Sequence, residues 1–264
     1  MNLVVLTPLD LLLAASLVLL LAWISRRMHF GIENRLVVAA LRTTVQLMLI
    51  GLVLKVLFDN ATMIWVALLA GMMLLIAGRE VMARQERRFA GWWGYGVGTL
   101  SMFISSFAVT VLALVVLVQP EPWYLPQYAI PLLGMLLGNT MNGIALALDR
   151  LTTSAWRQRQ IIEAQLMLGR TAAQAISDIR RESVRVGLVP IVNAMAAAGV
   201  ISLPGMMTGQ ILAGAPPMEA VKYQILIMFL IAAGTGFGTL GAVWLGARRL
   251  FDERERLRLD RLSV

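Results

Sequence analysis

The residues best able to contact a substrate within this sequence are uncharged, and they gather in its second half. In residues 134–143, Met135, Asn139 and Asn142 recur at spacings of four and three, so they share one face of a helix. Their amide groups could bond to neighbouring helices or line a polar path. Both interpretations stay open at this point, and we name these three residues as candidates for a translocation path.

A second group of polar and sulfur-bearing residues begins at Asn193. Residues 200–214 are apolar but interrupted by glycine and proline, and they are too short to cross a membrane twice. They predict an outer loop or a partly re-entrant loop, whose free carbonyls need protein or a water-filled cavity beside them. The path candidates here are Asn193, Ser202, Met206, Met207, Thr208 and Gln210. The thioether groups of the methionines suit copper better than iron. The residues that would bind a metal ion therefore remain unknown.

Several kinds of chemistry are absent from the sequence. The centres of the apolar stretches carry no Asp or Glu, although an ion-coupled carrier usually keeps an ionisable residue there. There is no cysteine, the only histidine is His29, and no nucleotide-binding or hydrolase motif occurs. We therefore expect a protein that is not an enzyme and binds no cofactor itself. If its transport is active, ATP and magnesium are held by another subunit.

The elements that must position these residues are membrane spans. Of the 264 residues 59% are hydrophobic and 14% charged, and the mean hydropathy is +0.76, so a bilayer must cover most of the chain. We predict an all-α, polytopic membrane protein with a single transmembrane domain over residues 1–264 and about seven helices. The predicted spans are 9–24, 37–58, 63–77, 96–118, 128–147, 184–203 and 221–247.

The basic residues give this map an orientation. Twenty of the 23 lie in alternate loops or in the tail 248–264, and therefore on one face. The positive-inside rule makes that face cytoplasmic, with the N-terminus outside and the C-terminus inside. Topology thus explains the net charge of +8 without nucleic acid. We expect a multi-pass protein of the bacterial inner membrane.

The longest loop, residues 149–185, lies on the basic side. Its apolar residues recur at helical spacing up to Gly169, and Thr171 can cap a second helix. Such a helix either lies on anionic lipid or docks a cytoplasmic partner, and composition leaves these two readings open.

Two glycine pairs predict close helix packing. Gly134 with Gly138, and Gly234 with Gly238, each form a small-xxx-small pattern that lets a neighbouring helix approach.

Several runs resemble one known family. Residues 130–139, 168–171, 188–190, 200–209 and 220–224 together look like the FetB-type iron-export permease family of ABC transporters, whose plant relatives are implicated in aluminium tolerance. The resemblance covers about residues 42–249. It implies a membrane permease subunit that pairs with a separate ATP-binding subunit and exports a metal ion such as iron.

The long loop also resembles the ABC-permease signature that seats in a cleft of the ATPase. Glu163 and Ala164, then Gly169, then Ile179 fit its spacing, whereas Gln165 replaces its second alanine. The ATPase-docking residues implied by this resemblance are Glu163, Ala164, Gly169, Arg170, Thr171 and Ile179.

The expected assembly is a homodimer of this chain in a lipid bilayer, bound to two copies of the ATP-binding subunit and to no nucleic acid. The alternatives are an ABC permease for a non-metal small solute, an assembly or sensor protein without transport, and a self-powered carrier. The missing central carboxylate disfavours the last of these.

Overall fold

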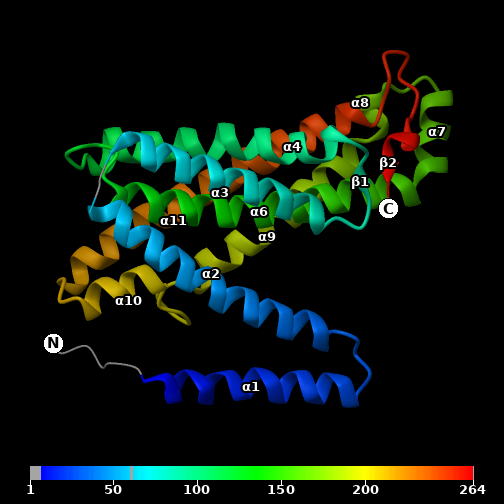
Figure 1. Ribbon diagram of the computed structural model, residues 1–264. Coiled ribbons are helices and arrows are strands. Elements are labelled where there is room, and N and C mark those ends of the chain that lie inside the picture. The colour runs from blue at the N-terminus through cyan, green and yellow to red at the C-terminus, as the bar shows by residue number, and fades with distance from the viewer. Residues whose placement is uncertain (1–6, 60–61, 264) are drawn as a thin grey trace. The chain divides into compact units, whose positions relative to one another are not determined.

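The computed structural model describes residues 7–59 and 62–263 and shows an all-α, polytopic membrane protein (Figure 1). The chain divides into two compact units. The first comprises residues 1–62 with 212–214, and the second comprises residues 63–211 with 215–264.

The first unit is a pair of packed helices, α1 (Pro8–Arg27) and α2 (Glu33–Asp59). Thr7 caps α1, since its hydroxyl accepts a hydrogen bond from the Asp10 backbone N–H and its own N–H donates to Asp10 Oδ2 at 2.8 Å. Large apolar side chains are exposed along both helices. Such surfaces are typical of helices that face lipid or other membrane helices.

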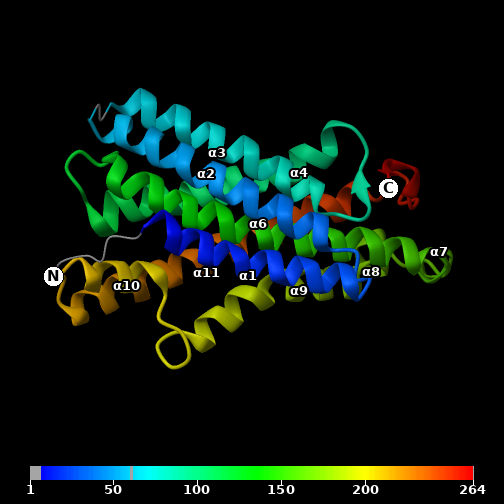
Figure 2. The same ribbon diagram turned by 60° about the horizontal axis from the view of Figure 1, so that its bottom comes forward.

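The second unit is a bundle around α6 (Pro126–Arg157), which packs against α3 (Met63–Ala83), α9 (Ser177–Ala197) and α11 (Pro217–Arg249) (Figures 1 and 2). A further span runs through α4 (Trp92–Met102), η1 (Phe103–Phe107), α5 (Ala108–Leu112) and η2 (Ala113–Val118), where η1 and η2 are π-helical. Within the described residues, six helices are long and apolar enough to cross a membrane. They are α1, α2, α3, the composite span Trp92–Val118, α6 and α11.

The seventh predicted span, 184–203, differs from expectation. Helix α9 begins earlier, among the charged residues of the long loop, and ends at Ala197. The chain then turns at residues 198–204, where Gly199 adopts a positive φ of 80°, and continues as the short helix α10 (Gly205–Leu212). Glycine and proline interrupt the helix here, so residues 184–203 do not form one continuous helix, and neither α9 nor α10 is among the six described helices long and apolar enough to cross a membrane.

Two glycines, one on α6 and one on α9, lie where these helices approach each other closely. A Cβ at Gly187 would lie 2.6 Å from the Gly143 carbonyl oxygen and 2.8 Å from Thr239 Cγ2 on α11. Carbon atoms in contact are normally about 3.5–4.0 Å apart, so no side chain fits at Gly187 without displacing a helix. These glycines therefore allow α6, α9 and α11 to meet.

The two predicted glycine pairs differ in their surroundings. On α11, a Cβ at Gly234 would lie 3.0 Å from Leu136 Cδ2, and one at Gly238 would lie 2.5 Å from Thr140 Cγ2, so α6 packs closely there. On α6, a Cβ at Gly134 would meet only Met73 Cε, at 3.3 Å. No described atom lies within 4 Å of a Cβ at Gly138, so the close approach expected there is absent within the described chain. On α6 it occurs at Gly143 instead.

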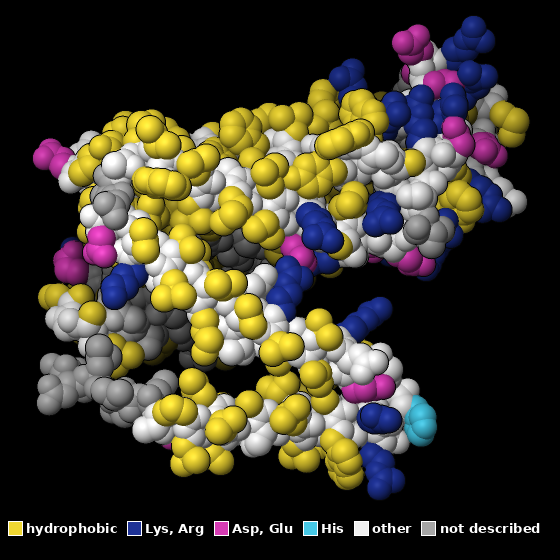
Figure 3. Space-filling model, viewed as in Figure 1, with side chains coloured by type: hydrophobic (Ala, Val, Ile, Leu, Met, Phe, Trp, Pro, Cys, Tyr) yellow, Lys and Arg dark blue, Asp and Glu magenta, His cyan; other side chains and the backbone are white. Residues whose placement is uncertain are grey.

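The end of the second unit that carries most of its arginines is a folded cap, which we call the arginine-rich end. It contains α7 (Arg159–Met167), α8 (Ala172–Ala175), η3 (Leu259–Arg261) and a small antiparallel sheet. In that sheet β1 (Arg88–Phe89) pairs with β2 (Leu262–Ser263), so the C-terminal tail folds back onto the α3–α4 loop. Figure 3 shows basic side chains crowded at this end and apolar side chains along the helices.

Candidate functional site

The predicted docking loop is a compact turn between α7 and α8. The Leu168 N–H donates to the Ala164 carbonyl at 3.1 Å, and the Arg170 N–H donates to the Gln165 carbonyl at 3.1 Å. Gly169 between them has a φ of +84°, in the left-handed region that favours glycine.

The second helix of the loop starts at a capping box. The Thr171 hydroxyl accepts from the Gln174 N–H, while the Thr171 N–H donates to Gln174 Oε1 at 3.0 Å. The helix–turn–helix expected from the spacing of Gly169 and Thr171 is therefore present.

Buried isoleucines fix this loop to the bundle. Ile162 and Ile176 are almost wholly buried, and Ile179, expected to contact an ATPase, is only 6% exposed. Ile179 therefore packs against the bundle and anchors the loop, and its part in docking stays a prediction.

The exposed face of the loop carries the other predicted docking residues. Glu163, Ala164 and Arg170 are exposed. Next to them Met167 and Leu168 are each 83% exposed, which the sequence reasoning missed. Two neighbouring exposed apolar side chains form a small hydrophobic patch at this turn. We call residues 167–170 the loop tip. The sequence signal for this exposure is the position of Met167 and Leu168 directly before Gly169, where the turn begins.

The C-terminal tail contacts the loop at the start of α8. Glu255 Oε2 accepts a hydrogen bond from the Ala172 N–H at 3.1 Å, at the start of α8. Arg261 Nη1 donates to the carbonyls of Arg249 and Phe251. An open hollow of about 650 Å³ lies between the loop and the tail. Its lining residues are Glu163, Leu166, Met167, Gly169, Arg170, Arg254, Glu255, Arg256 and Leu257.

Ion pairs hold the tail in shape. The Arg258 guanidinium donates two hydrogen bonds to Asp260 and lowers the pKa of that carboxyl to about 2. The Arg256 backbone N–H donates to Asp252 and lowers the pKa of Asp252. Both carboxylates are therefore charged at neutral pH.

The three path candidates on α6 lie on one incompletely covered face of that helix. Met135 and Asn139 are half-buried, and Asn139 Nδ2 donates to the Met135 carbonyl at 2.8 Å. Asn142 is exposed and accepts a hydrogen bond from Arg84 Nη1 of the α3–α4 loop. The shared face expected from their spacing is therefore present.

The remaining candidates lie on α9, the turn and α10. Asn193 and Ser202 are exposed, and Thr208 Oγ1 donates to the Pro204 carbonyl at 3.3 Å. Gln210 Oε1 is buried without a hydrogen-bond partner among the described residues. Met206 and Met207 are half-buried on α10. Within the described chain, no hydrogen bond joins this group to the three residues of α6.

The donors along these helices are amide, hydroxyl and thioether groups. The described residues contain no group of three or more His, Asp or Glu side chains placed to hold a metal ion.

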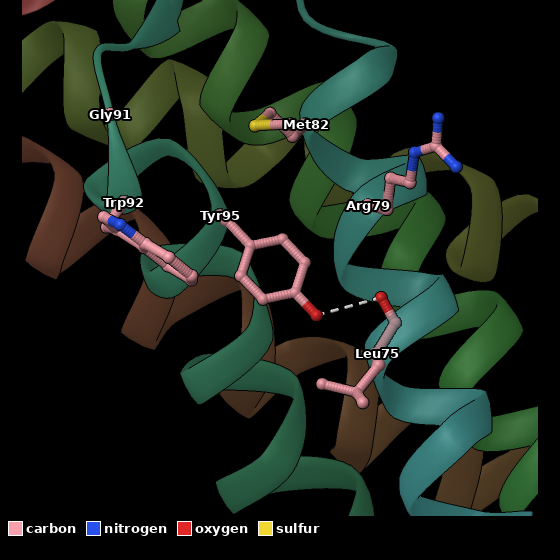
Figure 4. Close-up of a pocket in the computed structure, with 6 residues that line it drawn as sticks. All are labelled: Leu75, Arg79, Met82, Gly91, Trp92 and Tyr95. Atoms are coloured by element: carbon pink, nitrogen blue, oxygen red, sulfur yellow. Dashed lines mark hydrogen bonds between the residues drawn. The ribbon is translucent and has the colours of Figure 1, made fainter.

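A separate hollow of about 450 Å³ lies between α3 and α4 near the arginine-rich end. In Figure 4 the Tyr95 hydroxyl points at the Leu75 carbonyl, to which it donates at 3.0 Å, while Arg79 and Trp92 lie around the rim. None of the predicted path residues lines this hollow.

Comparison with known proteins supplies a family. The family described as "Uncharacterised protein family (UPF0014)" matches residues 8–251. The chain is 38% identical over 249 residues to UPF0014 membrane protein slr1647 of Synechocystis, covering 93% of this chain and 92% of that protein. It is 32% identical to the Escherichia coli protein named probable iron export permease protein FetB, covering 96% of each. It is 31% identical to the Arabidopsis thaliana protein ALUMINUM SENSITIVE 3, covering 88% of this chain and 83% of that protein. No solved structure matches.

Proposed function

The chain belongs to the UPF0014 family of membrane proteins, and on that premise we propose that it is the permease subunit of an ATP-binding-cassette exporter. In this proposal a separate subunit binds ATP and magnesium, and two copies of it act on a homodimer of this chain. The exported substrate is a metal ion, with iron the first candidate because one relative is named an iron export permease. The setting is a bacterial inner membrane.

The loop tip is the observation that carries the proposal. It presents exposed Met167 and Leu168 at the end of α7, whose residues Glu163 and Ala164 are also exposed, and buried Ile162 and Ile176 pack the loop against the bundle. An exposed apolar turn that is packed onto a folded domain is suited to insertion in a partner's pocket, because it loses little conformational freedom on binding. The tail behind it adds stiffness through the Glu255 bond.

The connection of this loop to the bundle supports a lever mechanism. α6 leads into α7 with a single intervening residue, Gln158, and α8 leads into α9 through Ile176. A displacement of the loop by ATP binding is therefore passed to the helices that carry the path candidates. ATP would bias an equilibrium between inward-open and outward-open states.

Uncovered polar faces support a dimer with the path near its axis. Asn139 and Asn142 on α6 are incompletely covered, Asn193 on the outer half of α9 is exposed, and α10 has no buried residue. Faces that mix amide and apolar side chains are costly against lipid, so a second copy is their natural cover.

The docking part is tested by measuring ATP hydrolysis by a candidate ATP-binding-cassette ATPase from the same organism, with and without the permease in proteoliposomes. Gly169→Val is expected to abolish the stimulation, because valine does not tolerate the left-handed φ and the loop tip changes shape. Gly31→Val is the matched control, since Gly31 has a φ of +71° in the α1–α2 loop. Stimulation that survives in Gly169→Val, or fails equally in both variants, contradicts the assignment.

The substrate is tested in inside-out vesicles that contain both subunits. ATP-dependent uptake of ferrous iron is expected, and the same assay with other divalent cations defines the selectivity. A permease that stimulates ATP hydrolysis without metal uptake is a transporter for another solute. If the chain neither stimulates ATP hydrolysis nor supports metal uptake, it is a sensor or an assembly protein.

A further inference from the structure

A long apolar groove lies between α11 and the composite span Trp92–Val118. Leu100, Ile104 and Leu112 line one side, and Phe237 and Trp244 line the other, around a hollow of about 640 Å³. Ser105 contributes to the wall, but its hydroxyl donates to the Ser101 carbonyl of its own helix at 2.8 Å. The groove therefore offers little hydrogen bonding and suits a hydrocarbon chain.

The groove ends in a basic pocket. A second hollow of about 410 Å³ shares Trp244 with the groove and lies between the start of α9 and α11, where Arg180 and Arg181 line it. The Arg248 guanidinium lies over the Trp244 ring, 4.5 Å from its centre. Two arginines thus line the hollow that adjoins the groove at Trp244, and a third stacks on the Trp244 ring itself.

These guanidinium groups are available to an anion. Arg181 has a long ion pair of 3.9 Å with Asp178, and both side chains are largely exposed. Among the described residues, no carboxylate is paired with Arg180 or Arg248. Arginine matches phosphate oxygens with two parallel hydrogen bonds, so the pocket favours a phosphate group.

The length of the groove matches one leaflet of a bilayer. The twelve-residue step from Leu100 to Leu112 corresponds to about 18 Å at a rise of about 1.5 Å per residue. Half of a hydrocarbon core is about 15 Å thick. The groove starts at the arginine-rich end, which the positive-inside rule places in the cytoplasm, so the leaflet concerned is the cytoplasmic one.

We propose that this groove and its basic pocket bind one anionic phospholipid of the cytoplasmic leaflet. The phosphate lies among Arg180, Arg181 and Arg248, and an acyl chain lies along α11 against the composite span. A free phosphate ion would leave the groove unused. The hollow between α3 and α4 has a single arginine, Arg79, and is the weaker candidate (Figure 4). Because the bound lipid bridges α9 and α11, it stabilises the bundle whatever the substrate is.

The test measures thermal unfolding of the full-length protein in a neutral detergent. The added probes are dioleoylphosphatidylglycerol, dioleoylphosphatidylcholine and inorganic phosphate. Since a ligand that binds only the folded state raises the midpoint, phosphatidylglycerol is expected to raise it more than the other two. In the double variant R180Q/R248Q, the apparent affinity for phosphatidylglycerol is expected to fall by on the order of tenfold.

The matched charge control is R26Q/R27Q. It removes the same charge at the end of α1, where Arg27 also lies over a tryptophan, Trp23, at 5.5 Å from the ring centre. This variant is expected to keep the preference for phosphatidylglycerol.

The groove has its own pair of variants. In Gly241→Leu the Cβ fits, 3.6 Å from the nearest atom, Ser101 Oγ, but the remaining side chain occupies groove space. This variant is expected to weaken binding of both lipids. Gly236→Leu adds the same bulk on α11 at an open position outside the groove, and is expected to bind like the parent protein.

Three results would overturn the proposal. The first is an equal response of the parent protein to both lipids, and the second is a response to inorganic phosphate as large as that to phosphatidylglycerol. The third is an unchanged preference in R180Q/R248Q together with unchanged binding in Gly241→Leu.

Discussion

Alanine at Gly187 is expected to destabilise the bundle, because the added methyl group collides with the backbone of α6. Its Cβ would lie 2.6 Å from the Gly143 carbonyl oxygen and 2.8 Å from Thr239 Cγ2. Restoring a normal contact of about 3.5 Å requires α9 to move by roughly 0.9 Å. Overpacking of this kind costs about 1–3 kcal/mol, and the rigid backbone neighbour places this case in the upper half of that range.

The same substitution at Gly138 is the internal comparison, because no described atom lies within 4 Å of a Cβ there. Replacing a helical glycine by alanine favours the helix by about 1 kcal/mol at either position. Gly187→Ala should therefore lose about 1–2 kcal/mol of unfolding free energy, while Gly138→Ala should gain up to about 1 kcal/mol.

The assay is equilibrium unfolding of the full chain in mixed micelles with increasing dodecyl sulfate, followed by helical circular dichroism. The reasoning fails if Gly187→Ala is as stable as Gly138→Ala, because the α6–α9 approach would then not be as close as the structure has it.

The remaining predictions concern the C-terminal tail. Glu255→Ala should make the tail more sensitive to limited proteolysis than Glu253→Ala, since Glu255 caps the Ala172 N–H and Glu253 makes no described hydrogen bond. The folded-state pKa of Asp260 is lowered to about 2 and that of Asp252 is also lowered, so their stabilisation is fully present above the ordinary carboxyl pKa of about 4 and is lost as the pH falls through the lowered pKa values. Amide exchange in the tail, corrected for intrinsic rates, should accordingly stay constant from pH about 8 to about 5 and rise below about 4. Loss of protection already at pH about 6 would contradict the ion-pair account.

Six of the seven expected spans could be predicted because long apolar runs are a local property of the sequence. The interruption between α9 and α10 could not be predicted in the same way. Gly199 and Pro204 indicate an interruption, but hydropathy does not say whether the chain then turns back or continues as a second short helix.

The docking loop shows the same division between local and tertiary information. The turn at Gly169 and the cap at Thr171 depend on neighbouring residues, so spacing predicts them. The burial of Ile179 and the exposure of Leu168 depend on where the bundle lies, which spacing along one helix does not specify. The support from Glu255 comes from 83 residues further along the chain.

Close glycine packing is also a tertiary property. Gly134 and Gly138 have the expected spacing, but the glycine of α6 that neighbouring helices approach closely is Gly143, which faces Gly187 of α9. A small-residue pattern in one helix indicates a surface that permits close approach. Where the approach occurs depends on the residues of the partner helix.

The central claim, that the loop tip docks an ATPase, is tested most directly by cross-linking from one introduced thiol. Because the chain has no cysteine, Leu168→Cys provides a unique reactive group at an 83% exposed position. Glu121→Cys, exposed at the opposite end of the second unit, is the control. Membranes that contain the variant and the candidate ATPase are treated with a thiol-reactive cross-linker. The account predicts a permease–ATPase adduct from Leu168→Cys and none from Glu121→Cys, whereas no adduct from Leu168→Cys, or equal adducts from both, would contradict it.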